Sequence, residues 1–135
     1  MESLRYLSMM AVGYLLTITL ETSVLLVGLS RRHPYRRILF AGCWLTACTY
    51  PIVWLVLPPL LPERWLYLLV AETFAPVGEC LLFYGTFGHT EPRSVRATWR
   101  DMIAITVANL VSFLGGELLA HFGMWDAVKW VFEQL

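Results

Sequence analysis

The chain has 135 residues, of which 58% are hydrophobic and 15% are charged, and its ten acidic and ten basic residues give a formal net charge of zero. Soluble domains usually carry about 25% charged residues, so the composition is too apolar for a typical water-soluble protein. The zero net charge argues against a nucleic-acid-binding protein, which would present a basic surface.

The first apolar run extends from about residue 4 to residue 29. It is longer than the apolar core of a signal peptide, which has roughly 7–15 residues, and it contains Glu21. Arg31 and Arg32 follow the run where a signal peptide would have small residues and a cleavage site. We therefore expect a retained first membrane span.

Three further apolar runs cover about residues 38–57, 65–88 and 102–122. A helix needs about 20 mainly apolar residues to cross the hydrocarbon core. The sequence thus predicts an all-α membrane protein in which residues 1–122 form a bundle of four transmembrane helices. Pro51 and Pro76 lie inside the second and third runs, and each removes a backbone donor. Either an ordinary kink or a locally opened helix that lines a site is expected at each.

Residues 123–135 have their own periodicity. Apolar residues recur at helical spacing, namely Met124, Trp125, Val128, Val131, Phe132 and Leu135. This pattern predicts a short C-terminal amphipathic helix, too short to span the membrane. We expect it to lie in the outer interface or to dock on a partner subunit.

Basic residues between the runs predict the orientation. The two loops at about residues 31–37 and 89–101 hold seven arginines: Arg31, Arg32, Arg36, Arg37, Arg93, Arg96 and Arg100. Because arginine-rich short loops stay in the cytoplasm, we expect a multi-pass protein of a bacterial-type inner (plasma) membrane with both termini outside.

Four glutamates lie in the apolar runs: Glu21, Glu72, Glu79 and Glu117. A charged acid at the centre of a membrane helix costs about 2.5–3.5 kcal/mol on insertion scales, so such residues usually face a bundle interior or a water-filled cavity. Glu72 and Glu79 are seven residues apart, which places them on one helix face and about 10 Å apart along the axis.

The expected topology sorts the polar residues of the spans into two tiers. The inner tier contains Glu21 and Glu79, with Asn109 and Thr46. The outer tier contains Glu72 and Glu117, with Tyr50 or Trp54 nearby.

Two functions are compatible with such an array. The carboxyls, with Asn109, can bind and translocate protons or a cation. Alternatively, protonated glutamates can act as interhelical hydrogen-bond donors in a non-catalytic structural or assembly subunit of a larger membrane complex. The fourth run supports close helix packing with a stripe of small residues, namely Ala104, Ala108, Ser112, Gly116 and Ala120. A lone four-helix bundle buries little surface, so a homo-oligomer or other membrane subunits are expected as partners.

Motifs for catalysis are absent from the sequence: we find no nucleophile elbow, no zinc-protease motif, no phosphate-binding glycine loop and no haem-attachment pattern. A non-enzymatic protein is therefore favoured, and no catalytic residue or cofactor is assigned. Glu117 and His121 are four residues apart and form a weak candidate metal pair, with an interfacial histidine as the alternative. Cys43, Cys48 and Cys80 lie in apolar runs, where we expect them to pack.

Overall fold

A computed structural model describes residues 2–124, 126, 127 and 130 of the chain. Four of its helices are long and apolar enough to cross a membrane, namely Tyr6–Gly28, Tyr35–Leu60, Arg64–Phe87 and Val95–His121. The predicted all-helical fold with four apolar helices is thereby confirmed. The predicted amphipathic helix at residues 123–135 lies mostly outside the described residues.

The helical segments follow one another closely along the chain. In order they are α1 (Glu2–Gly28), α2 (Tyr35–Pro51), the π-helix η1 (Ile52–Val56), α3 (Leu57–Leu60), α4 (Arg64–Phe87) and α5 (Val95–His121). Segments α2, η1 and α3 together form the second apolar helix.

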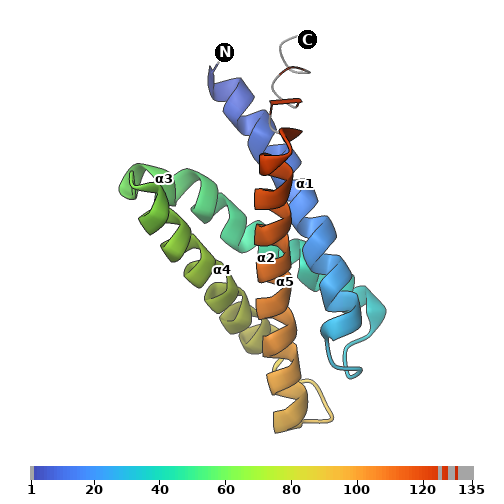
Figure 1. Ribbon diagram of the computed structural model, residues 1–135. Helices are drawn as coiled ribbons and strands as arrows, with labels where there is room; N and C mark the ends of the chain where they lie inside the picture. Colours follow the sequence, from blue (N-terminus) through green and yellow to red (C-terminus); the bar gives the residue numbers. More distant parts are fainter. Residues whose placement is uncertain (1, 125, 128–129, 131–135) are drawn as a thin grey trace.

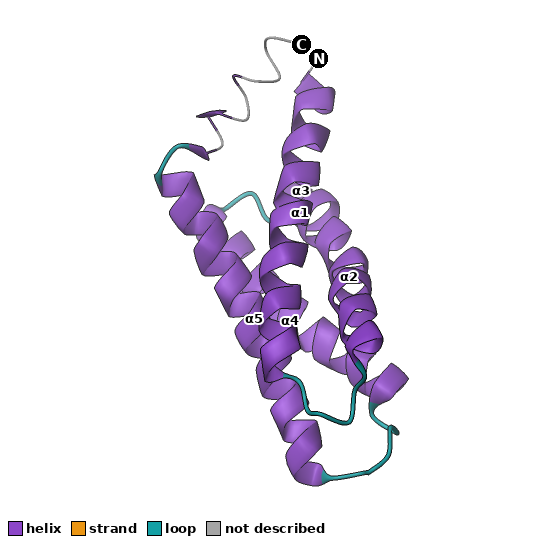
Figure 2. Ribbon diagram, turned by 90° about the vertical axis from the view of Figure 1, so that its right-hand side faces the viewer, coloured by secondary structure: helices purple, strands orange, loops and turns teal. Residues whose placement is uncertain are grey.

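The four long helices form an up-and-down bundle (Figure 1). Helix α1 packs against α2 and α5, and α4 packs against the same two helices. Helices α1 and α4 therefore lie on one diagonal of the bundle, with α2 and α5 on the other. The two arginine-rich loops lie together at one end, which we call the arginine end (Figure 2). The first turns of α1 and the last turns of α5 lie at the opposite end, which we call the terminal end.

The fourth helix begins earlier than the sequence predicts. It starts at Val95 rather than near residue 102, and the hydroxyl of Ser94 accepts a hydrogen bond from the backbone N–H of Ala97 at 3.4 Å. The residues before Met102 have the polar character of a loop, which is why hydropathy alone places the boundary too late. They instead form two further helical turns, in which Asp101 is buried.

The two intramembrane prolines have different effects. Pro51 ends α2 and is followed directly by the π-helix η1, a local widening that often occurs at functional sites. Pro76 lies inside a continuous α4, where it removes the donor that would otherwise reach the carbonyl of Glu72. The opened-helix interpretation therefore fits Pro51, and α4 continues through Pro76.

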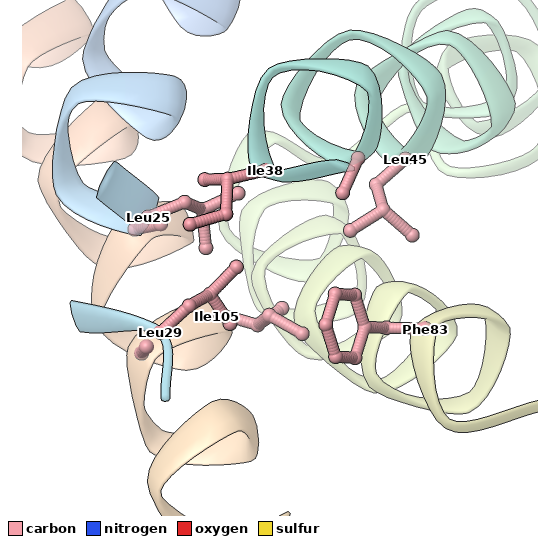
Figure 3. Close-up of a cluster of buried hydrophobic side chains, with 9 residues drawn as sticks. Leu25, Leu29, Ile38, Leu45, Phe83 and Ile105 are labelled. Carbon is pink, nitrogen blue, oxygen red and sulfur yellow. The ribbon is translucent and has the colours of Figure 1, made fainter. Parts of the chain in front are cut away.

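A cluster of buried hydrophobic side chains fills the half of the bundle near the arginine end. Figure 3 shows buried side chains from all four long helices pointing toward one another there. The cluster consists of Leu25, Leu29, Ile38, Ala41, Leu45, Phe83, Ala104, Ile105 and Ala108. Toward the terminal end, α3 and α4 diverge from α1 and α5 (Figure 1). The bundle is therefore closed at one end and opens toward the other.

Small residues allow the closest helix approaches. A Cβ at Gly42 would collide with the side chain of Thr22, and a Cβ at Gly28 would lie 2.8 Å from Cβ of Ala104. The predicted stripe on α5 packs in its first half, where Ala104 and Ala108 are buried. Farther along, a Cβ added at Gly116 would meet nothing within 4 Å, and this residue lines a cavity instead.

We predict that Gly42→Ala destabilises the bundle, because α1 and α2 must separate to accommodate one methyl group. Overpacking of this kind typically costs about 1–3 kcal/mol. Gly85→Ala is the matched control, since a Cβ there meets nothing within 4 Å. Thermal unfolding in detergent should show a lower midpoint for Gly42→Ala alone. Equal midpoints for the two variants would contradict the close approach of α1 and α2.

Candidate functional site

The carboxyl group of Glu21 lies inside the bundle and is hydrogen-bonded on both oxygens. Glu21 is only 3% exposed. Its Oε2 lies 2.6 Å from the hydroxyl of Thr46 on α2, and its Oε1 lies 2.8 Å from the hydroxyl of Ser112 on α5. The α1 carboxyl therefore links the two helices on which it packs.

Glu79 occupies the equivalent position on α4. It is also 3% exposed. Its Oε1 lies 2.8 Å from the hydroxyl of Thr49 on α2, and its Oε2 accepts a hydrogen bond from Nδ2 of Asn109 on α5 at 2.8 Å. Acids thus come from one diagonal pair of helices and their partners from the other.

The two acids take their hydrogen-bond partners in opposite order along α2 and α5, which places the two carboxyl groups at similar depth. Helices α2 and α5 run in the same direction, and each contributes two partners three residues apart. Glu21 binds the earlier α2 residue and the later α5 residue, whereas Glu79 binds the later α2 residue and the earlier α5 residue. The predicted inner tier of Glu21, Glu79, Asn109 and Thr46 is therefore brought together, and we call it, with Thr49 and Ser112, the carboxyl layer.

The asparagine in this layer has a fixed role. Its amide nitrogen lies 2.8 Å from Glu79 Oε2 and 3.1 Å from the carbonyl oxygen of Ile105, and both of these are acceptors. The Asn109 NH₂ group therefore uses both of its hydrogens as a donor. A proton carried by Glu79 consequently belongs on Oε1, the oxygen that faces Thr49.

A cavity of about 350 Å³ extends from the carboxyl layer toward the terminal end. All four intramembrane glutamates line it: Glu21, Glu72, Glu79 and Glu117. The two predicted tiers thus share one cavity, with contributions from all four long helices. Near the terminal end it is also lined by Arg64, the first residue of α4.

The outer tier is less enclosed than the inner tier. Glu72 is partly buried, and Glu117 is exposed. Arg64 contacts both carboxyl oxygens of Glu117, at 3.3 and 3.2 Å. Nothing in the sequence pattern indicates this pair, because Arg64 lies just before the third apolar run and reads as part of the connecting loop.

Aromatic residues form much of the cavity wall near η1. Tyr50 and Trp54 stack with ring centroids 5.6 Å apart, and both line the cavity together with Tyr67 of α4. The hydroxyl of Tyr50 donates to the carbonyl of Met10 at 3.2 Å, which ties α2 to α1. Tyr50 and Trp54 thus line the same cavity as the outer glutamates, as the two-tier arrangement predicts.

No trio of His, Cys, Asp or Glu side chains among the described residues is placed to hold a metal ion. Glu117 is paired with Arg64, and the ring of His121 packs against Phe122 with a centroid distance of 5.7 Å. The weak Glu117–His121 metal hypothesis is therefore not supported by this geometry.

A second polar cluster, which the sequence did not reveal, lies at the arginine end. Asp101 is completely buried and accepts hydrogen bonds from the backbone N–H of Ser30 at 2.7 Å and from Nη2 of Arg32 at 2.6 Å. Nε2 of His33 lies 3.0 Å from the same carboxyl group. This arginine-end cluster holds the α1–α2 loop against α5.

The sequence does contain one signal for this cluster. Asp101 is the only acid between the arginines of the second basic loop and the fourth apolar run. An acid so close to a span, opposite a loop with four arginines, is well placed to be an ion-pair partner. The positive-inside rule uses the arginines only as a topology signal, and so it does not indicate the pairing.

The chain matches no family model, no curated protein and no solved structure. Its function is therefore argued from its own residues.

We predict that Asp101→Ala strongly destabilises the protein, because the variant leaves a buried arginine without its counter-charge. Removal of one partner from a buried ion pair typically costs about 3–5 kcal/mol. Glu91→Ala is the matched control, since Glu91 pairs with Arg93 on the surface and its side chain is 73% exposed. Exposed pairs contribute about 0–1 kcal/mol. Similar unfolding midpoints for both variants would show that the buried cluster does not close the arginine end.

Proposed function

We propose that this protein binds and releases protons, or exchanges a proton for a cation, at Glu21 and Glu79 as a step in translocation across a plasma membrane of the bacterial inner-membrane type. The observation that carries the proposal is the hydrogen bonding of the carboxyl layer, which suits both protonation states of the acids.

Three hydroxyls give the layer this property. Each lies within hydrogen-bond distance of a carboxyl oxygen and of a carbonyl in its own helix. The carbonyl distances are 2.8 Å from Thr46 to Gly42, 3.2 Å from Thr49 to Leu45 and 2.9 Å from Ser112 to Asn109. Because a hydroxyl has one hydrogen, it can donate to only one of its two neighbours at a time.

Because each hydroxyl can switch between two acceptors, a carboxyl group can gain or lose a proton without leaving a polar atom unpaired. When Glu21 is ionised, the hydroxyl of Thr46 donates to the carboxylate. When Glu21 is protonated, its O–H donates to Thr46, whose hydroxyl turns to the carbonyl of Gly42. The same exchange applies between Glu79 and Thr49. A carboxyl group that serves only as a structural hydrogen-bond donor would not need partners that can change from donor to acceptor.

The two acids also influence each other. Neighbouring carboxyls at one depth cannot easily both ionise, so the pair should hold a shared proton or a cation at neutral pH. Among the described residues, carboxyls do not converge in threes, which favours a proton or a singly charged ion over a chelated divalent metal ion.

Access to the layer comes from the terminal end. The cavity joins Glu21 and Glu79 to Arg64 and Glu117 on that side. On the other side, the apolar core and the arginine-end cluster separate the layer from the loops. From Asn109 to Asp101 this barrier spans eight residues of α5, or about 12 Å. With the arginine end in the cytoplasm, the cavity opens to the outside.

We predict that Glu79→Gln and Glu21→Gln each reduce proton flux into liposomes, under an imposed pH gradient, to the level of empty liposomes. At position 79, glutamine can keep both existing contacts, because its oxygen can accept from Asn109 while its nitrogen donates to Thr49. Folding should therefore survive, as circular dichroism and gel filtration would show.

Glu91→Gln, in the exposed loop at the arginine end, is the matched control and should retain wild-type flux. If wild-type flux does not exceed that of empty liposomes, or if the layer variants leave it unchanged, the translocation proposal fails. A structural or assembly subunit, in which glutamine replaces the acid without effect, would then take its place.

The orientation has its own test. In a chain whose native cysteines are replaced, Glu63→Cys should react with a membrane-impermeant maleimide in intact cells, whereas Ser94→Cys should react only after permeabilisation. Both positions are exposed; Glu63 directly precedes α4 and Ser94 directly precedes α5, and these two antiparallel helices begin at opposite ends of the bundle. Labelling of Ser94→Cys in intact cells would reverse the proposed orientation.

A further inference from the structure

The outer half of the cavity, toward the terminal end, differs from the carboxyl layer in the charged residues that line it. Four acids and one base line the whole cavity, and among the described residues Arg64 pairs with Glu117. Glu21 and Glu79 are engaged within the carboxyl layer. Glu72 is therefore the lining acid that belongs neither to the carboxyl layer nor to the Arg64 pair, and it lies between them along α4, so its carboxyl group is the one available to a ligand.

Aromatic groups line the same cavity as this carboxyl group. Tyr50 and Trp54 come from the second helix, and Tyr67 lies on α4 five residues before Glu72. Aromatic rings attract organic cations through their π-electrons, and quaternary ammonium groups are bound in this way. A carboxylate together with aromatic walls thus favours a cation with an apolar body over a small hydrated ion.

The size of the cavity is consistent with such a ligand. The whole cavity, including the part beside the carboxyl layer, has a volume of about 350 Å³, whereas small-molecule sites have roughly 300–1,000 Å³, so the outer half has room only for a small cation. A single proton or metal ion needs far less room.

We propose that the outer half of the cavity binds a monovalent organic cation of the quaternary ammonium class, with Glu72 as its counter-charge and Trp54 as an aromatic wall. The coupling of this ligand to protons rests on the proposed function of Glu21 and Glu79, whereas the binding itself does not. An arriving cation lowers the proton occupancy of the carboxyl layer by electrostatic repulsion, so each ligand bound releases protons toward the open end.

The test is equilibrium dialysis of benzyltrimethylammonium against the whole protein in uncharged maltoside micelles, with empty micelles as the blank. Benzenesulfonate, an anion of similar size, is the charge control. We expect saturable binding of the cation, which weakens as the pH is lowered because protonation removes the negative charges, and no saturable binding of the anion.

Two variants locate the site. Glu72→Gln should weaken cation binding about 10- to 100-fold, the effect of losing the coulombic attraction of one opposite charge. Trp54→Leu should weaken it about 2- to 30-fold through loss of the cation–π contact. Trp65→Leu is the matched control, because Trp65 is exposed and lies outside the cavity lining. Its affinity should equal that of the wild type.

A quaternary ammonium can reach the cavity as a free solute or as the headgroup of phosphatidylcholine. Addition of that lipid to the micelles distinguishes the two: competition with the probe assigns the site to a lipid headgroup, and unchanged affinity assigns it to a solute. Equal binding of cation and anion, or binding that Glu72→Gln leaves unaltered, would overturn the inference. Proton flux that depends on Glu79 would then still support the proposed function.

Discussion

The hydrocarbon core of a membrane contains no water to satisfy a polar group, so each buried carboxyl must obtain its hydrogen bonds from the protein. This constraint explains the arrangement of the whole middle of the bundle. Glu21 and Glu79 face inward from diagonal helices, and every oxygen of both acids has a partner on α2 or α5. Because these partners are spaced by three residues on each helix, the acids fix the register of all four long helices as well as supplying the chemistry.

Different residues make one half of the bundle closed and the other half open. Leu45, Phe83 and Ile105 fill the space between the carboxyl layer and the loops, and buried ionic contacts to Asp101 hold the α1–α2 loop in place. Beyond the carboxyl layer, the chain has Pro51 and the π-helix η1, where α-helical pairing is interrupted and α3 and α4 lean outward. The protein therefore combines a closed end with an open end, which is the asymmetry that a site accessible from one side requires.

Helix number and the inner tier could be predicted because run length, spacing and topology together determine the depth of each residue. Depth alone groups Glu21 and Glu79 with Asn109 and Thr46, and their side chains do meet. The roles of Ser112 and Thr49 could not be predicted, since a small hydroxyl residue in a span fits packing equally well. The Arg64–Glu117 and Arg32–Asp101 pairs depend on the reach of long side chains across the bundle, which periodicity does not encode. Proton movement by the acids stays a prediction.

If the proposed function is correct, the carboxyl layer accepts and releases protons without changing its helix contacts. Infrared difference spectroscopy of the carboxyl C=O stretch, recorded in lipid while the pH is varied, tests this property directly. We predict a protonated-carboxyl band that changes with pH, is reduced in Glu21→Gln and in Glu79→Gln, and is reduced further in the double variant, where the remaining acids still contribute, with unchanged amide bands throughout. A carboxyl band that stays constant with pH, or one that is as strong in the double variant as in the wild type, would contradict the proposed role of the layer.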